Sequence, residues 1–380
     1  MPTAEEPDIT IVPGRELPTE RIAVRADLEE VQQRPWWERA IFGLLGIFLF
    51  VTALGLMKEG AADLIPSLSG SVFTDNAWST LGLGWLGACL VLSGSPVAAS
   101  ALTLLDGGAI SRTQAFTMLT GSRLGASFVV LVVGVVYALR DKEQGQRRAP
   151  VSIGVLSLLM TTTIYVPGAI IGFLLLERGA FDGFDIGTSP GLTSATDTLF
   201  GWSVDLLTGL VPGWMLFPIG VVVLVVGFNC FDRMLPQLGA EDFERREVSW
   251  TTRKWPMFLA GCVVTLLTLS VSVSLTLLVP LVAKGHVRRS NTLPYIAGAN
   301  ITTLVDTLVA AVLLGNQDGV RVVVAVTSVV AVFTLAVLVT AYPLLRRLLL
   351  SIARRVLASN RRLAAFTAVL FVVPLVLIAL

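Results

Sequence analysis

Long apolar stretches, separated by short polar ones, run along the chain from about residue 40 to its end. At about 1.5 Å of rise per residue, most are long enough to cross a hydrocarbon core of about 30 Å as helices. Residues 1–35 are polar instead, and Trp36 and Trp37 follow where an aromatic interface belt is expected. The pattern predicts an all-α polytopic membrane protein with apolar segments near 40–57, 81–105, 113–139, 151–176, 213–230, 257–282, 291–315, 321–343 and 363–380.

Composition supports this class and excludes others. The 380 residues are 54% hydrophobic and only 14% charged, whereas a soluble domain carries about 25% charged residues. The net charge of +1 creates no field that would attract nucleic acid. The three cysteines and the single histidine, His286, have no metal-ligand spacing, and no nucleophile–base pair stands out. We therefore expect neither an enzyme nor a bound metal or cofactor.

One broken apolar segment occurs twice in the chain. The first copy spans 84–127 and the second 261–304, so corresponding residues are 177 positions apart. Internal repeats with interrupted apolar stretches are typical of secondary transporters. The matched pairs are Gly84 and Gly261, Leu92 and Leu269, Ser93 and Ser270, Ser95 and Ser272, Gly108 and Gly285, Arg112 and Arg289, and Gly121 and Gly298.

The charges between the apolar segments indicate the topology. Arginine and lysine gather in the loops 140–149, 231–256 and 344–362, which the positive-inside rule places in the cytoplasm. The segments 58–80 and 177–212 are acidic or neutral and belong outside. The chain satisfies this pattern if two of its apolar segments enter and leave the membrane by the same face.

The segments 81–105 and 257–282 fit such re-entrant hairpins. The first contains Ser-Gly-Ser-Pro at 93–96, where Gly is permissive and Pro lacks the N–H that a helix needs. The second contains Ser270, Ser272 and Ser274, whose hydroxyls can satisfy backbone groups freed at a break. The first hairpin would enter from outside and the second from inside, which makes the two repeats inverted.

This gives about seven crossings plus two hairpins in a multi-pass protein of the cell (plasma or inner) membrane, with a cytoplasmic N-terminus. The predicted organisation is a cytoplasmic polar arm at 1–35, a transmembrane repeat at 36–192, an external interfacial segment at 193–212, a second repeat at 213–345, and a basic cytoplasmic linker with a C-terminal transmembrane helix at 346–380.

Two motifs in each repeat resemble those of the sodium–phosphate cotransporter family (type II-like). The family carries a QSSS hairpin motif, which here stands as Leu-Ser-Gly-Ser at 92–95 and Leu-Ser-Val-Ser at 269–272. Its downstream GANIGT-type motif stands as Gly-Ser-Arg-Leu-Gly-Ala at 121–126 and Gly-Ala-Asn-Ile-Thr-Thr at 298–303. The resemblance covers roughly residues 40–345 and implies that these motifs line sodium and phosphate sites.

The chain departs from the family motifs at positions that matter for such sites. Leucine replaces the glutamine in both hairpins, at Leu92 and Leu269. The central serine is Gly94 in one hairpin and Val271 in the other, and the first asparagine is Arg123. Each replacement of an amide or hydroxyl removes a candidate oxygen ligand for sodium.

The remaining polar residues still predict an anion site, because hydroxyls and arginine donate hydrogen bonds to oxyanions. A charge at membrane depth requires a partner or a cavity. We therefore hypothesise that Arg123 either pairs with Asp306 or replaces a sodium ion. The candidate substrate- and ion-binding residues are Ser93, Ser95, Arg123, Ser270, Ser272, Ser274, Asn300, Thr302, Thr303 and Asp306.

Three functions stay open at this point. The first is a secondary transporter for phosphate or a related small oxyanion, coupled to sodium. The second is a sodium-independent anion transporter in which Arg123 stands in for the cation. The third is a transport-inactive membrane sensor or partner-binding paralogue. The expected partners are the anion, sodium and the lipid bilayer, and the oligomeric state, a homodimer included, is open.

Overall fold

Every regular element in the described part of the computed structural model is a helix. The structure describes residues 35–68, 71–140, 148–184, 190–234, 252–283 and 287–380. The polar arm predicted at 1–35, apart from Pro35, lies outside these residues, as do His286 and parts of the three basic loops. The helices are α2 (Trp36–Leu68), α3 (Ala77–Val91), α4 (Ser95–Asp106), α5 (Arg112–Ala126), α6 (Phe128–Arg140), α7 (Arg148–Glu177), α8 (Pro190–Thr208), α9 (Gly213–Met234), α11 (Lys254–Thr268), α12 (Val271–Thr276), α13 (Leu278–Ala283), η2 (Arg289–Asn291), α14 (Thr292–Thr302), α15 (Val305–Leu313), α16 (Gln317–Thr340), α17 (Tyr342–Leu357) and α18 (Asn360–Ala379).

Seven helical segments among the described residues are long and apolar enough to cross a membrane. They coincide with the seven predicted crossings, which confirms the all-α polytopic class. That both hairpins re-enter the bilayer stays a prediction. The seven segments are Trp36–Leu68, Arg112–Leu139, Arg148–Glu177, Gly213–Met234, Arg289–Leu313, Gln317–Thr340 and Asn360–Ala379.

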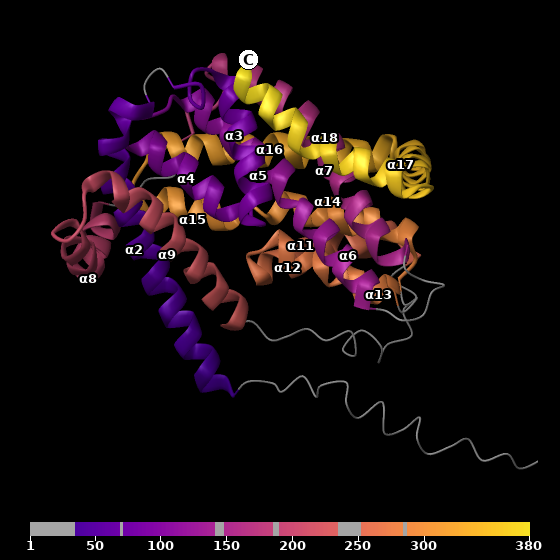
Figure 1. Cartoon of the computed structure of the whole chain (residues 1–380), viewed down its shortest axis with the longest axis horizontal. Coiled ribbons are helices and arrows are strands. Elements are labelled where there is room, and N and C mark those ends of the chain that lie inside the picture. The colour runs from indigo at the N-terminus through magenta and orange to yellow at the C-terminus, as the bar shows by residue number, and fades with distance from the viewer. Residues whose placement is uncertain (1–34, 69–70, 141–147, 185–189, 235–251, 284–286) are drawn as a thin grey trace, which may run out of the picture.

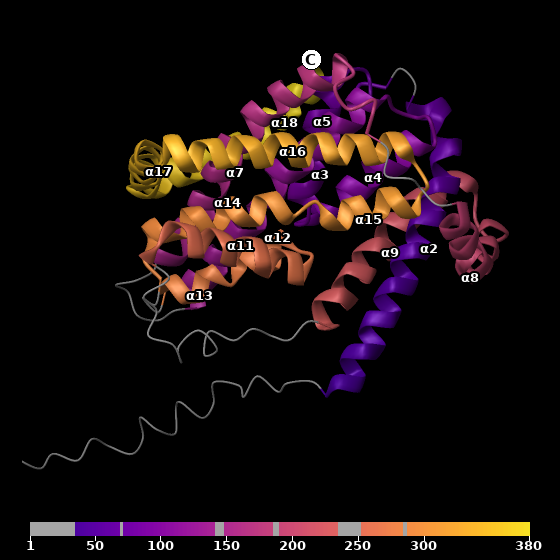
Figure 2. The same ribbon diagram turned by 180° about the vertical axis from the view of Figure 1, so that it is seen from behind.

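The first helices of the two repeats, α2 and α9, pack side by side through reciprocal contacts (Figures 1 and 2). Gly43 of α2 lies against the side chain of Met234, and Gly220 of α9 lies against that of Met57. The offset of 177 relates Gly43 to Gly220 and Met57 to Met234. A pair of contacts with exchanged roles is what a twofold relation between the repeats produces.

The first arm of each hairpin packs closely against the helix that follows the hairpin. Gly84 of α3 lies against the backbone carbonyl of Met118 on α5, and Gly261 of α11 lies against that of Tyr295 on α14. A side chain at either glycine would prevent this approach, and small residues serve the same purpose in many membrane helix pairs. The two repeats thus share this contact as well as their sequence.

The helix α7 occupies the middle of the molecule. It packs against α5, α6, α13, α14, α16 and α17. Its Tyr165 is fully buried and donates a hydrogen bond of 2.9 Å to the carbonyl of Asn300 on α14. In Figure 2, α16 runs above the broken helix formed by α14 and α15.

The returning arm of the second hairpin is not one continuous helix. The structure divides that arm into α12 and α13, with the junction at Leu277. Pro280 explains the division, because its nitrogen cannot donate the hydrogen bond that would join it to Thr276. The first hairpin has no proline at the matching place, and α4 runs unbroken from Ser95 to Asp106.

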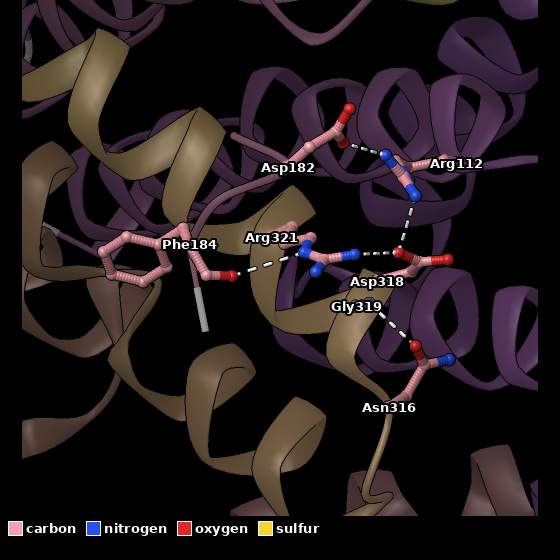
Figure 3. Close-up of polar contacts among 7 residues, drawn as sticks. All are labelled: Arg112, Asp182, Phe184, Asn316, Asp318, Gly319 and Arg321. Carbon is pink, nitrogen blue, oxygen red and sulfur yellow. Dashed lines mark hydrogen bonds and ion pairs between the residues drawn. The ribbon is translucent and has the colours of Figure 1, made fainter. Parts of the chain in front are cut away.

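Ion pairs join segment ends that the predicted crossing order places on one side of the membrane (Figure 3). Arg112, at the start of α5, is 2.6 Å from Asp182 and 2.7 Å from Asp318. Arg321 lies 3.1 Å from Asp318 and donates to the carbonyl of Phe184 at 3.3 Å. The start of α5, the segment after α7 and the start of α16 therefore meet at one end of the molecule.

Two further helices lie where the sequence predicted an interfacial segment and a linker. The segment 193–212 falls largely in α8, whose Ser203 shares a hydrogen bond of 2.9 Å with Thr52 of α2. The basic linker is helical, as α17, with Leu345 and Leu349 buried and its arginines exposed. The interfacial and cytoplasmic positions of these helices stay predictions.

Candidate functional site

Each predicted hairpin contains a backbone break at the same repeat position. Leu92 ends α3 with φ 57°, and Leu269 ends α11 with φ 48°. They are the only non-glycine residues with positive φ among the described residues. The left-handed conformation is unfavourable for a leucine but ends a helix abruptly. The repeat therefore preserves a strained conformation at both breaks, although neither has the glycine that usually adopts it.

The two breaks meet at one pocket of about 350 Å³. Ser93 reaches it from the first hairpin, and Ser270 and Ser272 reach it from the second. The helix α9 adds Asn229 and the exposed side chain of Asp232. Three of the predicted site residues, from segments 177 positions apart, thus share one cavity with two polar residues from a third element.

Sequence reasoning missed Asn229 and Asp232. Their counterparts in the first repeat are Thr52 and Gly55, so the repeat comparison gives no matched polar pair. A polar amide inside a predicted crossing is itself a signal, because such residues seldom face lipid. Asn229 donates to the carbonyl of Val225 at 3.0 Å, which fixes the orientation of its amide.

A second group of predicted residues is buried beside the first hairpin. Arg123, only 2% exposed, donates to Thr303 through Nη1, at 3.0 Å to the hydroxyl and 3.4 Å to the carbonyl. Its Nε donates to Ser122 at 3.3 Å. The backbone of Gly94 explains how the guanidinium fits, because a Cβ at this glycine would lie 3.3 Å from Arg123 Cζ. Gly94, at the centre of the first hairpin motif, thus leaves room for Arg123, which stands where the downstream family motif has asparagine.

Asp306 belongs to the same buried group, at 5% exposure. Its Oδ1 accepts hydrogen bonds from the backbone and the hydroxyl of Thr307, at 2.6 Å and 3.0 Å. Ser95 lies beside this carboxylate, and Arg123 is close enough to interact with it electrostatically. No ion pair within 4.0 Å joins Arg123 and Asp306, both of which the structure describes. The hypothesised pair is therefore a neighbouring pair of charges without direct contact.

The other three candidates make hydrogen bonds inside the protein. Asn300 donates to Thr161 at 3.1 Å, and Thr302 donates to the carbonyl of Cys262 at 3.1 Å. Ser274 accepts from Thr265 at 2.7 Å and shares a bond of 3.0 Å with the hydroxyl of Tyr295. These side chains hold α7, α11, α12 and α14 together and support the pocket and the buried charges.

Ser270 caps a helix, whereas its counterpart in the first repeat, Ser93, does not. The Ser270 hydroxyl caps α12 by accepting from the backbone N–H of Val273 at 3.3 Å, whereas α4 is capped by Gly94 without a side-chain bond. We expect Ser270→Ala to lower the free energy of unfolding by about 1 kcal/mol, and Ser93→Ala to change it little. Thermal unfolding of the purified variants in detergent measures this, and equal losses would contradict it.

A comparison with known protein families covers the second of the two hairpin breaks. Residues 223–380 match the Na+/Pi-cotransporter family model. The match runs from within α9 through the second hairpin to α18, and the internal repeat relates the first half of the chain to it. It supports the family that the motifs at 269–272 and 298–303 resemble. Comparisons with curated proteins and with solved structures gave no match.

The Na+/Pi-cotransporter match and the seven apolar helices together support a multi-pass membrane transporter. They argue against an enzyme, since the family moves ions rather than transforming them. The geometry adds which residues of this chain surround the two hairpin breaks.

Proposed function

We propose that the protein takes up inorganic phosphate or a related oxyanion across the cell membrane by sodium-coupled secondary transport. The observation that carries the proposal is the common pocket of the two hairpin breaks, with Ser93, Ser270 and Ser272 on its wall. In transporters built from inverted repeats, discontinuous helices meet at the substrate site near the membrane midplane. The family match supports phosphate as the substrate class.

The groups at the pocket suit an oxyanion. Serine hydroxyls can donate to its oxygens. The N-terminus of α4 begins at Ser95, and its backbone N–H groups favour negative charge. Arg123 adds a fixed positive charge just behind the first break, where its Cζ would lie 3.3 Å from a Cβ at Gly94.

The same pocket has features that suit sodium. The helices α3 and α11 both end at the breaks, and carbonyls at helix C-termini attract cations. Asp232 and Asn229 add side-chain oxygens on the wall formed by α9. A cation bound beside the anion would offset the charge that enters the low-dielectric interior, which is the physical basis for coupling the two.

Uptake of radiolabelled phosphate into proteoliposomes, with and without an inward sodium gradient, tests the proposal. We expect sodium-driven accumulation, and we expect Asp232→Asn to weaken the sodium dependence more than the affinity for phosphate. Asp318→Asn, in the ion-pair cluster of Figure 3, is the matched control and should leave uptake nearly unchanged. No uptake under either condition would favour a non-transporting relative.

The buried charge of Arg123 favours a second candidate, anion transport without sodium. Arg123 stands where the family motif has asparagine, so a guanidinium could replace a bound cation. Arg123→Asn distinguishes the two. Sodium dependence that appears only in the variant would support substitution of the cation, whereas sodium-driven uptake already present in the unmodified protein would exclude it.

A further inference from the structure

A dense group of arginines lies on the surface formed by α17 and the start of α18. No acidic residue follows Asp318 in the sequence, so neither helix carries a charge that balances them. None of these arginines forms an ion pair with another residue that the structure describes. We call this group the arginine surface; it consists of the exposed side chains of Arg346, Arg347, Arg354, Arg355, Arg361 and Arg362.

The apolar side chains of α17 explain why its arginines point outward. Leu345, Leu349 and Ala353 recur every four residues and form one buried stripe along the helix. The helix packs against α7, α16 and α18. At 3.6 residues per turn, Arg347 and Arg354 lie on the side opposite the stripe. Packing of the stripe therefore holds these arginines away from the helix bundle.

The helix α17 lies across the ends of two predicted membrane crossings. In Figures 1 and 2, α17 is seen nearly along its axis at one end of the molecule, whereas α16 and α18 run across the picture toward it. Both α16 and α18 are long and apolar enough to cross a membrane. A helix that joins their ends and lies across them runs along the membrane surface, which is the position of an interfacial amphipathic helix.

An aromatic and basic cluster marks the same level of the molecule. Lys254, at the start of α11, donates a hydrogen bond of 2.8 Å to the carbonyl of Leu338, close to the junction of α16 and α17. Its Nζ lies 4.9 Å from the ring centre of Trp255 and 5.5 Å from that of Tyr342. Tryptophan, tyrosine and lysine gather where a membrane meets water. The contacts around Lys254 thus support an interfacial position for α17.

Two exposed leucines lie beside the arginines. Leu344 and Leu348 are 71% and 51% exposed, although each is next to a buried residue of the same helix. They are one turn apart, and Arg355 follows Leu348 by two turns, so all three lie along one edge of α17. Leucines on this edge can reach acyl chains while the arginine extends its guanidinium to the headgroups.

We propose that the arginine surface binds the phosphodiester headgroups of anionic phospholipids, such as phosphatidylglycerol, in the cytoplasmic leaflet. Guanidinium groups bind phosphate oxygens in bidentate fashion. Clusters of basic residues on an amphipathic helix are typical of binding to anionic lipids. In phosphatidylcholine an ammonium group cancels the charge of the phosphate, so its attraction to unbalanced arginines is weaker. Because α17 joins α16 to α18 and packs on α7, the bound lipids would hold this end of the bundle in place.

Native mass spectrometry of the purified full-length protein in detergent tests the inference. The protein is titrated with phosphatidylglycerol and, separately, with phosphatidylcholine that has the same acyl chains. We expect phosphatidylglycerol to bind at least about fivefold more tightly, and its advantage to shrink as the ionic strength rises, because salt screens the attraction. Equal affinities for the two lipids would overturn the inference before any variant is made.

The double variant Arg347→Gln with Arg354→Gln tests the surface itself. We expect its affinity for phosphatidylglycerol to fall at least about tenfold, since each basic residue near an anionic surface contributes roughly fivefold. Arg347→Lys with Arg354→Lys keeps both charges and should stay within about threefold of the unmodified protein. Arg178→Gln removes an exposed arginine from the end of α7 and is the control for an unrelated charge. A glutamine variant that binds phosphatidylglycerol as tightly as the unmodified protein would show that the lipid binds elsewhere.

An excess of inorganic phosphate separates a lipid site from a site for the free anion. We expect phosphatidylglycerol to stay bound, because its acyl chains also contact the edge with Leu344 and Leu348, and displacement by phosphate would overturn the lipid as the occupant. The inference does not depend on what the protein transports, since lipid binding is measured directly. If the glutamine variant does not fold, the comparison of headgroups and the effect of salt in the unmodified protein still decide it.

Discussion

Replacing Arg123 with methionine is expected to destabilise the protein by about 1–3 kcal/mol, because it leaves the buried carboxylate of Asp306 without the nearby cation that compensates it, although the two make no direct contact. Asp306 is 5% exposed, and Arg123 is the cation that interacts with it electrostatically. Methionine is also a long side chain, so the loss of stability reflects the missing charge rather than a new cavity. Thermal unfolding of the variant in detergent, followed by size-exclusion chromatography, measures the effect.

The double variant Arg123→Met with Asp306→Leu is the internal control. Removing both charges removes the uncompensated carboxylate, so the double variant should recover most of the stability that Arg123→Met loses. It should nevertheless bind phosphate more weakly, since the positive charge of Arg123 behind the first break is gone. A double variant that is less stable than Arg123→Met alone would show that the two charges do not compensate each other.

Gly84→Ala is expected to have the second large effect, a loss of about 1–3 kcal/mol. The added Cβ would overlap the carbonyl of Met118, so α3 could no longer pack closely on α5. Gly261→Ala should cause a similar loss at the equivalent contact with Tyr295. Both variants should yield less folded protein after purification, measured by size-exclusion chromatography and thermal unfolding.

Gly87→Ala provides a matched control within the same helix as Gly84. A Cβ at Gly87 would meet the side chain of Val97 at 3.5 Å, an ordinary van der Waals distance. Alanine also has a higher helix propensity than glycine, so this variant should be as stable as the unmodified protein or slightly more stable. A loss at Gly87 as large as that at Gly84 would contradict the role of close packing.

Much of the architecture could be predicted because its causes are local or periodic. The seven crossings follow from the length of the apolar segments, and the structure contains seven suitable helices at the same places among the described residues. The hairpin breaks follow from Ser-Gly-Ser-Pro at 93–96 and from its counterpart 177 positions later. The division between α12 and α13 also has a local cause, since Pro280 lacks the N–H that a continuous helix would need there.

The candidate site could be predicted only in part. Ser93, Ser270 and Ser272 were expected from the repeat, and they line one pocket. Asn229 and Asp232 were not expected, because their place on that pocket depends on how α9 packs against the two breaks. Asn300, Thr302 and Ser274 carry the expected residue types, but their bonds to neighbouring helices depend on tertiary contacts.

The sequence by itself determined the helical membrane class, the two repeats and the positions of both breaks, because segment length, composition and repetition are written along the chain. Only the tertiary structure decided which polar groups meet across the repeats. In the folded protein Arg123 and Asp306 are neighbours without a direct ion pair. Arg123 instead hydrogen-bonds to Thr303 and Ser122, and Asp306 to Thr307. Which of several hydrogen-bond partners a buried charge takes depends on distances that arise only when the helices pack.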